Sequence, residues 1–243
     1  MQVAQGIHRV TRGVTNFYLI EDSGKVVLVD AGTPKDWDLF TKTLADLSLG
    51  LDDVEAVLLT HAHADHTGFA ERARTTANTN VWIHGADESS VTTGETAKPD
   101  GGMGAYLFKM QMYKTMMSLG SRGASKIIPV HEVSTFSDGE TLDVPGHPKI
   151  IHAPGHTAGS CALLLEGRDS LFAGDVLSTW NPLTGDIGPQ IMPAAMNANS
   201  EQALQSLDNL DDIEAGTMLP GHGDPWGEGV AAAVKLARET GRT

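Results

Sequence analysis

The chain has 243 residues, and 31 acidic against 17 basic side chains give it a formal net charge of −14. It has no cluster of Lys or Arg, and no apolar run reaches the roughly 18 residues of a membrane span, so we expect neither a nucleic-acid partner nor a membrane. A single cysteine excludes an internal disulfide, and the N-terminus lacks a basic stretch followed by an apolar one, which predicts a cytoplasmic protein.

The first third of the chain combines strands with helices. Short apolar runs predict strands at residues 6–11, 14–20, 25–29, 54–59 and 80–83. Apolar residues near helical spacing predict a helix at residues 35–47, and a second, short helix is expected to begin near Thr67.

Residues 87–126 form an insert in this pattern. Its first part, residues 88–102, is rich in Ser, Thr, Gly and Pro and predicts a loop. Its second part, residues 103–119, predicts a helix with two apolar sides, which are Tyr106, Met110, Tyr113 and Met117 on one and Phe108, Met112 and Leu119 on the other. Such a helix must bury both sides. One side packs on the body, and the other side has three open roles: core packing, a cap over the active site, or a contact in a homodimer.

The second half of the chain again gives strands and then helices. Strands are expected at residues 135–144, 149–152, 160–165, 170–172 and 216–219. Helices are expected at residues 201–210, with Ser200 as the N-cap, and at residues 226–240. Each half of the chain thus has strands followed by helices, which predicts two packed β-sheets with helices on their outer faces. We expect a single domain over residues 1–243.

The strongest functional signal is the run His61-Ala62-His63-Ala64-Asp65-His66, directly after the strand at 54–59. Neutral His is the commonest metal ligand, and zinc accepts His nitrogen and Asp oxygen together. A loop that leaves the end of a strand can turn all these side chains toward one point. The alternative is a polar loop that is rich in His and binds no metal.

Three more segments place a His or an Asp after a Gly, just past a short apolar run. They contribute His156, Asp175 and His222. Strand ends at one edge of a sheet can converge although they are far apart in sequence, so we expect a metal site there. The candidate ligands are His61, His63, Asp65, His66, His156, Asp175 and His222. Seven exceed the three protein ligands of one catalytic zinc and suit two metals with one shared ligand.

These residues resemble the motifs of the metallo-β-lactamase superfamily. The matching segments are Asn16–Ile20, Leu28–Gly32, Thr60–Gly68, Pro154–Thr157, Gly174–Asp175 and Gly221–His222. The resemblance implies an α/β fold, a four-layer αβ/βα sandwich with the metals at one edge between the sheets. It also implies two divalent metal ions, zinc in the first place, with manganese or iron as alternatives. By resemblance, one metal is held by His61, His63 and His156 and the other by Asp65, His66 and His222, while Asp175 bridges them together with a hydroxide.

The subgroup is indicated by Asp175. True β-lactamases lack a bridging Asp at this place, so the chain resembles instead the branch of lactonases and glyoxalase II-like thioesterases. It departs from lactonases of acyl-homoserine lactones, because residues 176–180 contain no Tyr. It departs from glyoxalase II, because Lys235, Arg238 and Arg242 lie on a regular helix and form no clear glutathione site. The insert at 87–126 matches no subgroup.

The implied chemistry is metal-assisted hydrolysis of a small ester, lactone, thioester or amide with a hydrophobic portion. Bound cations polarise a carbonyl and lower the pKa of water toward about 7. Asp65 and Asp175 are the expected catalytic carboxylates, with Asp65 orienting the hydroxide. Asp30 and Thr157 are candidates to orient the His ligands. The alternatives are a mononuclear-iron sulfur dioxygenase of the same fold, a β-lactam hydrolase, and a non-catalytic protein that binds a metabolite through the metals.

Overall fold

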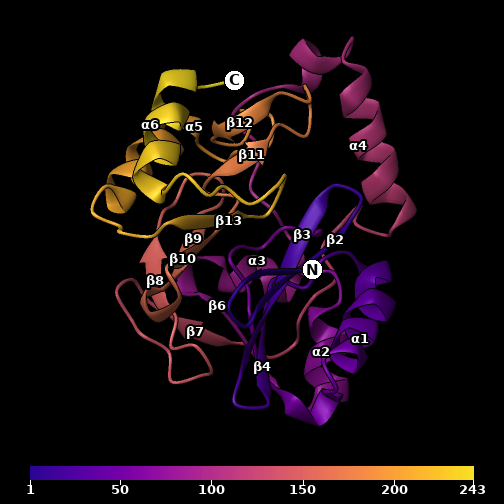
Figure 1. Cartoon of the computed structure of the whole chain (residues 1–243). Coiled ribbons are helices and arrows are strands. Elements are labelled where there is room, and N and C mark those ends of the chain that lie inside the picture. The colour runs from indigo at the N-terminus through magenta and orange to yellow at the C-terminus, as the bar shows by residue number, and fades with distance from the viewer.

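The strands of the protein form two β-sheets and a short ribbon (Figure 1). The computed structural model describes every residue from 1 to 243. The larger sheet has seven strands in chain order: β1 (Gln2–Ala4), β2 (Ile7–Arg12), β3 (Thr15–Asp22), β4 (Lys25–Val29), β5 (Val54–Leu58), β6 (Asn80–His84) and β7 (Ser134–Phe136). The smaller sheet has the order β13 (Thr217–Pro220), β10 (Ser170–Gly174), β9 (Cys161–Leu165) and β8 (Lys149–His152). The ribbon pairs β11 (Ser178–Trp180) with β12 (Ile187–Gln190).

Strand direction brings several strand ends to one place. β4, β5, β6 and β7 run parallel, so their carboxyl ends share one edge of the larger sheet. In the smaller sheet β10 runs parallel to β13, and both β8 and β10 run antiparallel to β9 between them. The strands β8, β10 and β13 therefore also point the same way, and their carboxyl ends share an edge.

Helices cover the outer face of each sheet (Figure 1). The helices α1 (Trp37–Asp46) and α2 (Ala70–Ala77) pack on the larger sheet, and α5 (Ser200–Gln205), the 3-10 turn Ser206–Leu210 and α6 (Val230–Thr240) pack on the smaller one. Helix, sheet, sheet and helix make four layers. The predicted αβ/βα sandwich is confirmed.

Side-chain alternation along β4 shows why the layers form. Val26 and Leu28 pack toward the helices, in the same cluster as Phe40, while Val27 and Val29 pack between the two sheets. Successive residues of a strand point to opposite faces, so a strand with an apolar residue at every position can contribute to two cores at once. Burying each such side chain stabilises the fold by about 1.5–3 kcal/mol.

The first part of the insert differs from the prediction. A helix, α3 (Glu88–Thr93), stands where the sequence predicts a loop. Ser and Thr are weak helix formers, which is why composition indicated a loop. The fully buried Val91 anchors this helix to the core, and Gly94 ends it with a left-handed backbone of φ 80°.

The second part of the insert is not one continuous helix. A 3-10 turn at Met103–Tyr106 precedes α4 (Met110–Ser121). Only Met112 and Thr115 of α4 are buried, whereas Met110 and Met117 are 69% and 74% exposed. The prediction that both apolar sides are buried is therefore wrong.

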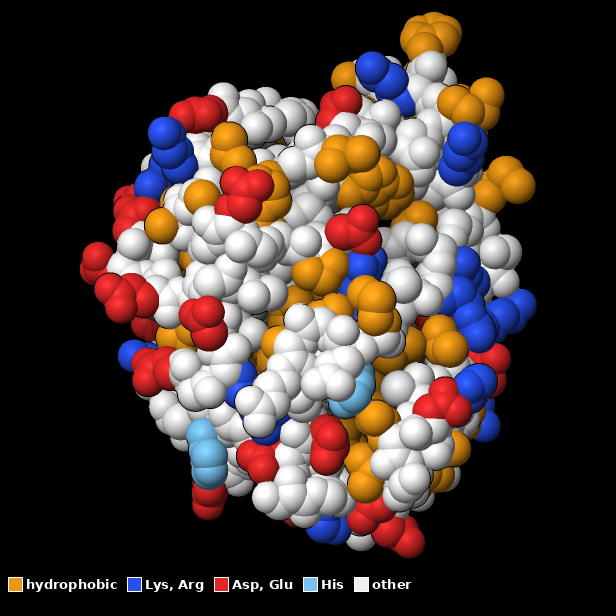
Figure 2. Space-filling view, in the orientation of Figure 1, with side chains coloured by type: hydrophobic (Ala, Val, Ile, Leu, Met, Phe, Trp, Pro, Cys, Tyr) orange, Lys and Arg blue, Asp and Glu red, His pale blue; other side chains and the backbone are white.

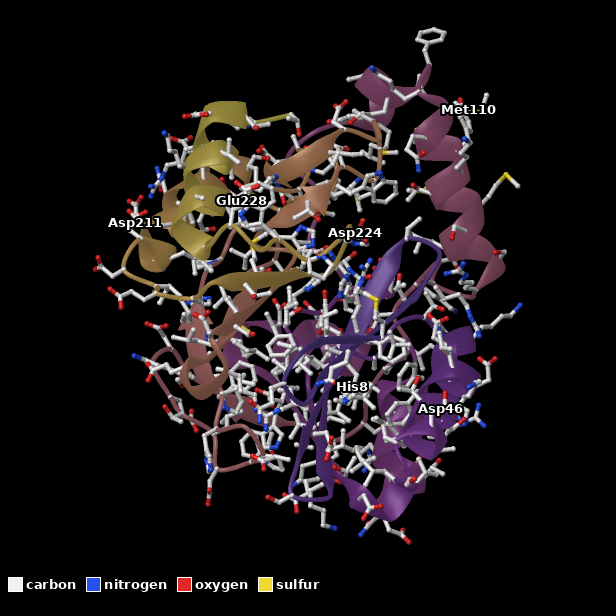
Figure 3. All side chains as sticks on the ribbon, in the orientation of Figure 1. His8, Asp46, Met110, Asp211, Asp224 and Glu228 are labelled. Carbon is white, nitrogen blue, oxygen red and sulfur yellow. The ribbon has the colours of Figure 1, made fainter.

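The position of α4 explains this exposure. It packs through Met112, beside Tyr106, onto Leu183 and Ala195, and it stands apart from the two sheets (Figure 1). Hydrophobic side chains protrude along this edge of the molecule (Figure 2). Met110 points away from the body (Figure 3). A homodimer contact on this face stays a prediction.

Three boundaries in the second half also differ. The strand predicted at 135–144 ends at Phe136. The N-cap of α5 is Asn199, whose side chain accepts from the Gln202 amide over 3.0 Å, and not Ser200. The last helix begins at Val230, because Trp226 instead pairs with Met218 next to β13.

None of the helices is both long and apolar enough to cross a lipid bilayer.

Candidate metal centre

The seven predicted ligands lie on loops that follow the converging strand ends. Residues His61 to His66 come directly after β5, in the larger sheet. In the smaller sheet, His156 follows β8, Asp175 follows β10 and His222 follows β13. Ligands that are far apart in sequence are brought together by strands that end at one edge between the two sheets.

Four side chains form a first group, His61, His63, His156 and Asp175, whose ligand atoms lie within 4.8 Å of one another. His156 Nε2 lies 2.8 Å from His63 Nδ1 and 3.2 Å from His61 Nε2. Imidazole nitrogens at these separations can share a cation.

Asp65, His66 and His222 form the second group. Asp65 Oδ2 lies 3.8 Å from His66 Nε2 and 3.6 Å from His222 Nε2. Asp175 Oδ2 stands between the groups, 3.2 Å from His156 Nε2 and 3.3 Å from His222 Nε2. All seven predicted residues are thus brought together, and the position of Asp175 suits a shared ligand.

Several buried polar atoms in this centre have no hydrogen-bond partner. They are His66 Nε2, His222 Nε2 and Asp175 Oδ1. A buried polar atom without a partner costs about 1–3 kcal/mol. A divalent cation of the zinc type takes His nitrogen and carboxylate oxygen, so it would satisfy the two imidazole nitrogens, and the donor set fits such an ion.

The second ring nitrogens of four ligands are held by other residues. His66 Nδ1 donates to Asp30 Oδ2 over 2.8 Å, as expected for Asp30, and His222 Nδ1 donates to the Val14 carbonyl over 2.6 Å. The two remaining contacts are His156 Nδ1 to Asn197 Oδ1 at 3.0 Å and His61 Nδ1 to Thr60 Oγ1 at 3.0 Å. Each contact turns Nε2 of the ring toward the centre.

Asp87 joins the two metal loops, a role the sequence analysis missed. Its carboxylate accepts from the Ala62 amide at 2.9 Å, the Gly159 amide at 2.8 Å and the Thr157 hydroxyl at 2.6 Å. Thr157, predicted to orient a ligand, therefore acts on Asp87 instead. The signal was present in the sequence, because Asp87 follows β6 at the same sheet edge as the ligands.

Burial and charge set the protonation of the centre. Burial lowers the pKa of His61 well below its ordinary value and that of His63 to about 3, so both are neutral rings ready to bind a cation. Burial alone would also lower the pKa of His66, but the carboxylates of Asp175, Asp65 and Asp30 outweigh it and raise the pKa to about 10. The three carboxylates around His66 thus favour a positive charge at this place in the centre.

The same balance acts on the carboxylates. Burial works against ionisation of Asp175, yet His222 and His66 hold the pKa of its carboxyl well below the ordinary value. For Asp65, burial is again opposed, by His66 first and His222 next, and the net shift of the pKa is downward. Both groups are therefore anionic, as metal binding requires.

A cleft of about 380 Å³ lies against the centre and includes His63, Asp65 and His156 in its walls. The two ends of the insert line it, with residues between Asp87 and Pro99 on one side and Ala124 to Ile127 on the other. No residue of 103–119 lines the cleft, and the wall residues of the insert all come from its two ends. A cap over the centre stays a prediction. Another cavity, of about 440 Å³ near Trp180 and Trp226, includes none of the seven ligands.

The sequence matches one known family. The model of the metallo-beta-lactamase superfamily matches residues 10–222. The probable metallo-hydrolase YflN of Bacillus subtilis is 27% identical over 92% of this chain and 86% of its own length. The probable metallo-hydrolase MJ0888 of Methanocaldococcus jannaschii is 26% identical over 86% of this chain and 88% of its own length.

Solved structures share the fold. The metallo-beta-lactamase family protein TTHA1429 of Thermus thermophilus has a TM-score of 0.68 at 24% identity, with 98% of this chain and 80% of that chain covered. The metallo-beta-lactamase SMB-1 has a TM-score of 0.71 at 17% identity, with 98% of this chain and 93% of that chain covered. At these identities the likeness concerns the fold alone.

Proposed function

The chain belongs to the metallo-beta-lactamase superfamily, and from this premise we propose that it is a dinuclear hydrolase of a small ester, lactone, thioester or amide. It is a metal-dependent hydrolase, as its family and its relatives among the metallo-hydrolases support. The number of metals and the substrate class are the proposed part.

One observation carries the dinuclear proposal. Asp175 Oδ2 lies 3.2 Å from His156 Nε2 in the first group of ligands and 3.3 Å from His222 Nε2 in the second. A shared carboxylate between two groups of three ligands is the arrangement expected when each group holds a cation. One group would consist of His61, His63 and His156, and the other of Asp65, His66 and His222. Zinc is the first expectation for both, because the donors are nitrogen and carboxylate oxygen.

When bound, divalent cations supply a polarised carbonyl and an activated water. The chain itself supplies the proton acceptor. Asp65 lines the cleft, and the Thr15 hydroxyl donates to its Oδ2 over 3.0 Å. This contact orients the carboxylate and leaves Oδ1 to take a proton from the attacking water and return it to the leaving group.

The walls of the cleft support a small substrate with a hydrophobic portion. Alanines and a proline, among them Ala97, Pro99 and Ala195, give apolar surface next to the metal ligands. Ligand sites are mostly apolar, with a few polar groups that fix orientation. Here the metal centre would orient the scissile carbonyl and the apolar walls would take the remainder.

The test combines metal analysis with a substrate panel. Protein saturated with zinc, manganese or iron should contain close to two equivalents, and it should cleave at least one of a panel of lactones, thioesters and simple esters. A content of one equivalent that added metal cannot raise would refute the dinuclear site. Iron with oxygen uptake would favour a sulfur dioxygenase, and activity confined to β-lactams would favour a β-lactamase.

A further inference from the structure

One wall of the metal cleft is formed by residues 195–198 of the segment 194–200, which contains Asn197. The Asn197 side chain is fully buried, its Nδ2 donates to the Met192 carbonyl over 2.6 Å, and its Oδ1 lies 3.0 Å from His156 Nδ1. Because an amide oxygen can only accept, His156 must carry its hydrogen on Nδ1. The other nitrogen, Nε2, is then free to face the metal centre.

Asp100 holds the Asn197 segment, residues 194–200, through hydrogen bonds of its amide and its carboxylate. The Asp100 amide donates to the Asn197 carbonyl over 2.7 Å, and its carboxylate accepts from the Ser200 amide over 3.1 Å. The next amide, of Gly101, donates to the Ala194 carbonyl over 2.9 Å. Asp100 and Gly101 therefore bind both ends of the wall that carries Asn197.

Residues beyond α6 complete this arrangement. Arg242 Nη2 donates to Asp100 Oδ2 over 2.9 Å, and the Ala194 amide donates to the main-chain oxygen of Thr243 over 2.9 Å. The Arg242 side chain is half exposed, so its ion pair contributes little to global stability. The ion pair instead fixes the position of Asp100, and Asp100 is the residue that hydrogen-bonds to the Asn197 segment.

We propose that the ion pair of Arg242 and Asp100, called the lock below, positions the Asn197 segment and, through it, the ring of His156 in the metal centre. Neither residue contacts the metal ligands or the substrate, so both are positioning residues. The lock connects the end of the C-terminal helix to the first group of ligands. It rests on the geometry of the ligand groups and not on which bond the enzyme cleaves.

The test compares two arginines near the same end of the chain. Arg242→Gln removes the lock. Arg238→Gln is the matched control, because Arg238 on α6 also forms exposed ion pairs, with Asp208 and Asp211, but none that reaches the cleft wall (Asp211 is labelled in Figure 3). Arg242→Lys retains the charge and is the conservative variant.

The readouts are the visible absorption spectrum of the cobalt-substituted full-length protein and its zinc affinity, measured by competition with a chelator. We expect Arg242→Gln to shift the cobalt bands and to weaken zinc binding roughly 3-fold or more. Arg242→Lys should restore both, and Arg238→Gln should leave both unchanged. Asn197→Ala, which removes the direct contact to His156, should weaken zinc binding by about 10- to 100-fold.

Two results would overturn the proposal. One is an Arg242→Gln protein with the same cobalt spectrum and zinc affinity as Arg238→Gln. The other is an Asn197→Ala protein that is folded and binds zinc as tightly as the wild type. Neither readout needs a substrate, so a failure to cleave any ester or thioester would count against the proposed function and would leave this test intact.

Discussion

The ring of His66 donates from Nδ1 to the carboxylate of Asp30 over 2.8 Å, although the two residues are 36 positions apart in the sequence. Asp30 stands directly after β4 with a left-handed backbone of φ 59°. Asp and Asn tolerate this conformation better than most residues. The turn places the carboxylate behind His66 and so aims Nε2 of the ring at the metal centre.

Replacing Asp30 with Asn should therefore weaken metal binding without disturbing the turn. The amide retains the size of the side chain but removes the charge that favours an Nδ1 hydrogen on His66. We expect zinc affinity at the second group of ligands to fall by about 10- to 100-fold. Equilibrium dialysis measures it, and Asp52→Asn, at an exposed position, is the control. Equal affinities in the two variants would show that Asp30 has only a structural role.

Asp175→Asn tests the shared ligand. The variant loses the anionic oxygen that lies near both groups of ligands, so we expect the metal content to fall from two equivalents toward one and kcat to fall more than about 100-fold. Asp186→Asn, whose carboxylate contacts only the Thr184 hydroxyl, should behave as the wild type. The measurement is the metal content of both variants after dialysis. Two equivalents of metal per chain in Asp175→Asn would exclude a bridging role.

The lining of the cleft predicts which part of the insert controls the size of the substrate. Ala97 lines the cleft, so Ala97→Trp should lower kcat/KM for long-chain esters by about 10-fold or more and leave acetyl esters nearly unaffected. Ala105 lies in the part of the insert that does not reach the cleft, and Ala105→Trp should change neither. The opposite result would restore residues 103–119 as the cap.

The exposed face of α4 predicts association of two copies. Contiguous apolar patches are rarely left uncovered on monomers, and Met110 and Tyr113 are 69% and 48% exposed. We expect the wild type to have the mass of a dimer in solution by light scattering, and the double variant Met110→Ser, Tyr113→Ser to be a monomer that keeps its activity on small substrates. A monomeric wild type would reject the contact.

Two histidines outside the metal centre predict how stability depends on pH. The rings of His84 and His152 stack with centroids 3.9 Å apart. Burial, and next the neighbouring His152, lower the pKa of His84 below its ordinary value of 6.5. The unfolded chain therefore binds a proton at the His84 ring more readily than the folded chain does. The stability contributed by the neutral His84 ring is fully present above pH 6.5 and is lost as the pH falls through the lowered pKa.

Urea unfolding at pH 7.5 and pH 5.5 can isolate this contribution. The wild type should lose more stability between the two values than His84→Gln, since the metal ligands titrate alike in both proteins. His147→Gln, at an exposed position, is the control and should follow the wild type. Identical losses in the wild type and His84→Gln would rule out a contribution of the stacked pair.

The sequence alone was enough to predict the layers of the fold and the set of candidate ligands. Both depend on local patterns. Continuous apolar runs such as Val26 to Val29 predict strands that are buried on both faces, and His61, Asp175 and His222 each stand within a few residues of the end of a short apolar run. The carboxyl ends of β10 and β13 meet at one edge because these strands are parallel, and the packing of the two sheets brings that edge beside the end of β5.

The tertiary structure decided the contacts that orient these ligands and the surface that stays exposed. Asn197 reaches His156 across 41 positions. Asp87 binds the Ala62 amide, 25 positions before it, and the Gly159 amide, 72 positions after it. No local pattern marks Asn197 for this role, and the place of Asp87 after β6 does not show which atoms its carboxylate accepts from. The exposure of α4 was equally hidden, because apolar spacing shows which side chains share a face of a helix. Only the packing of the rest of the chain determines whether anything covers that face.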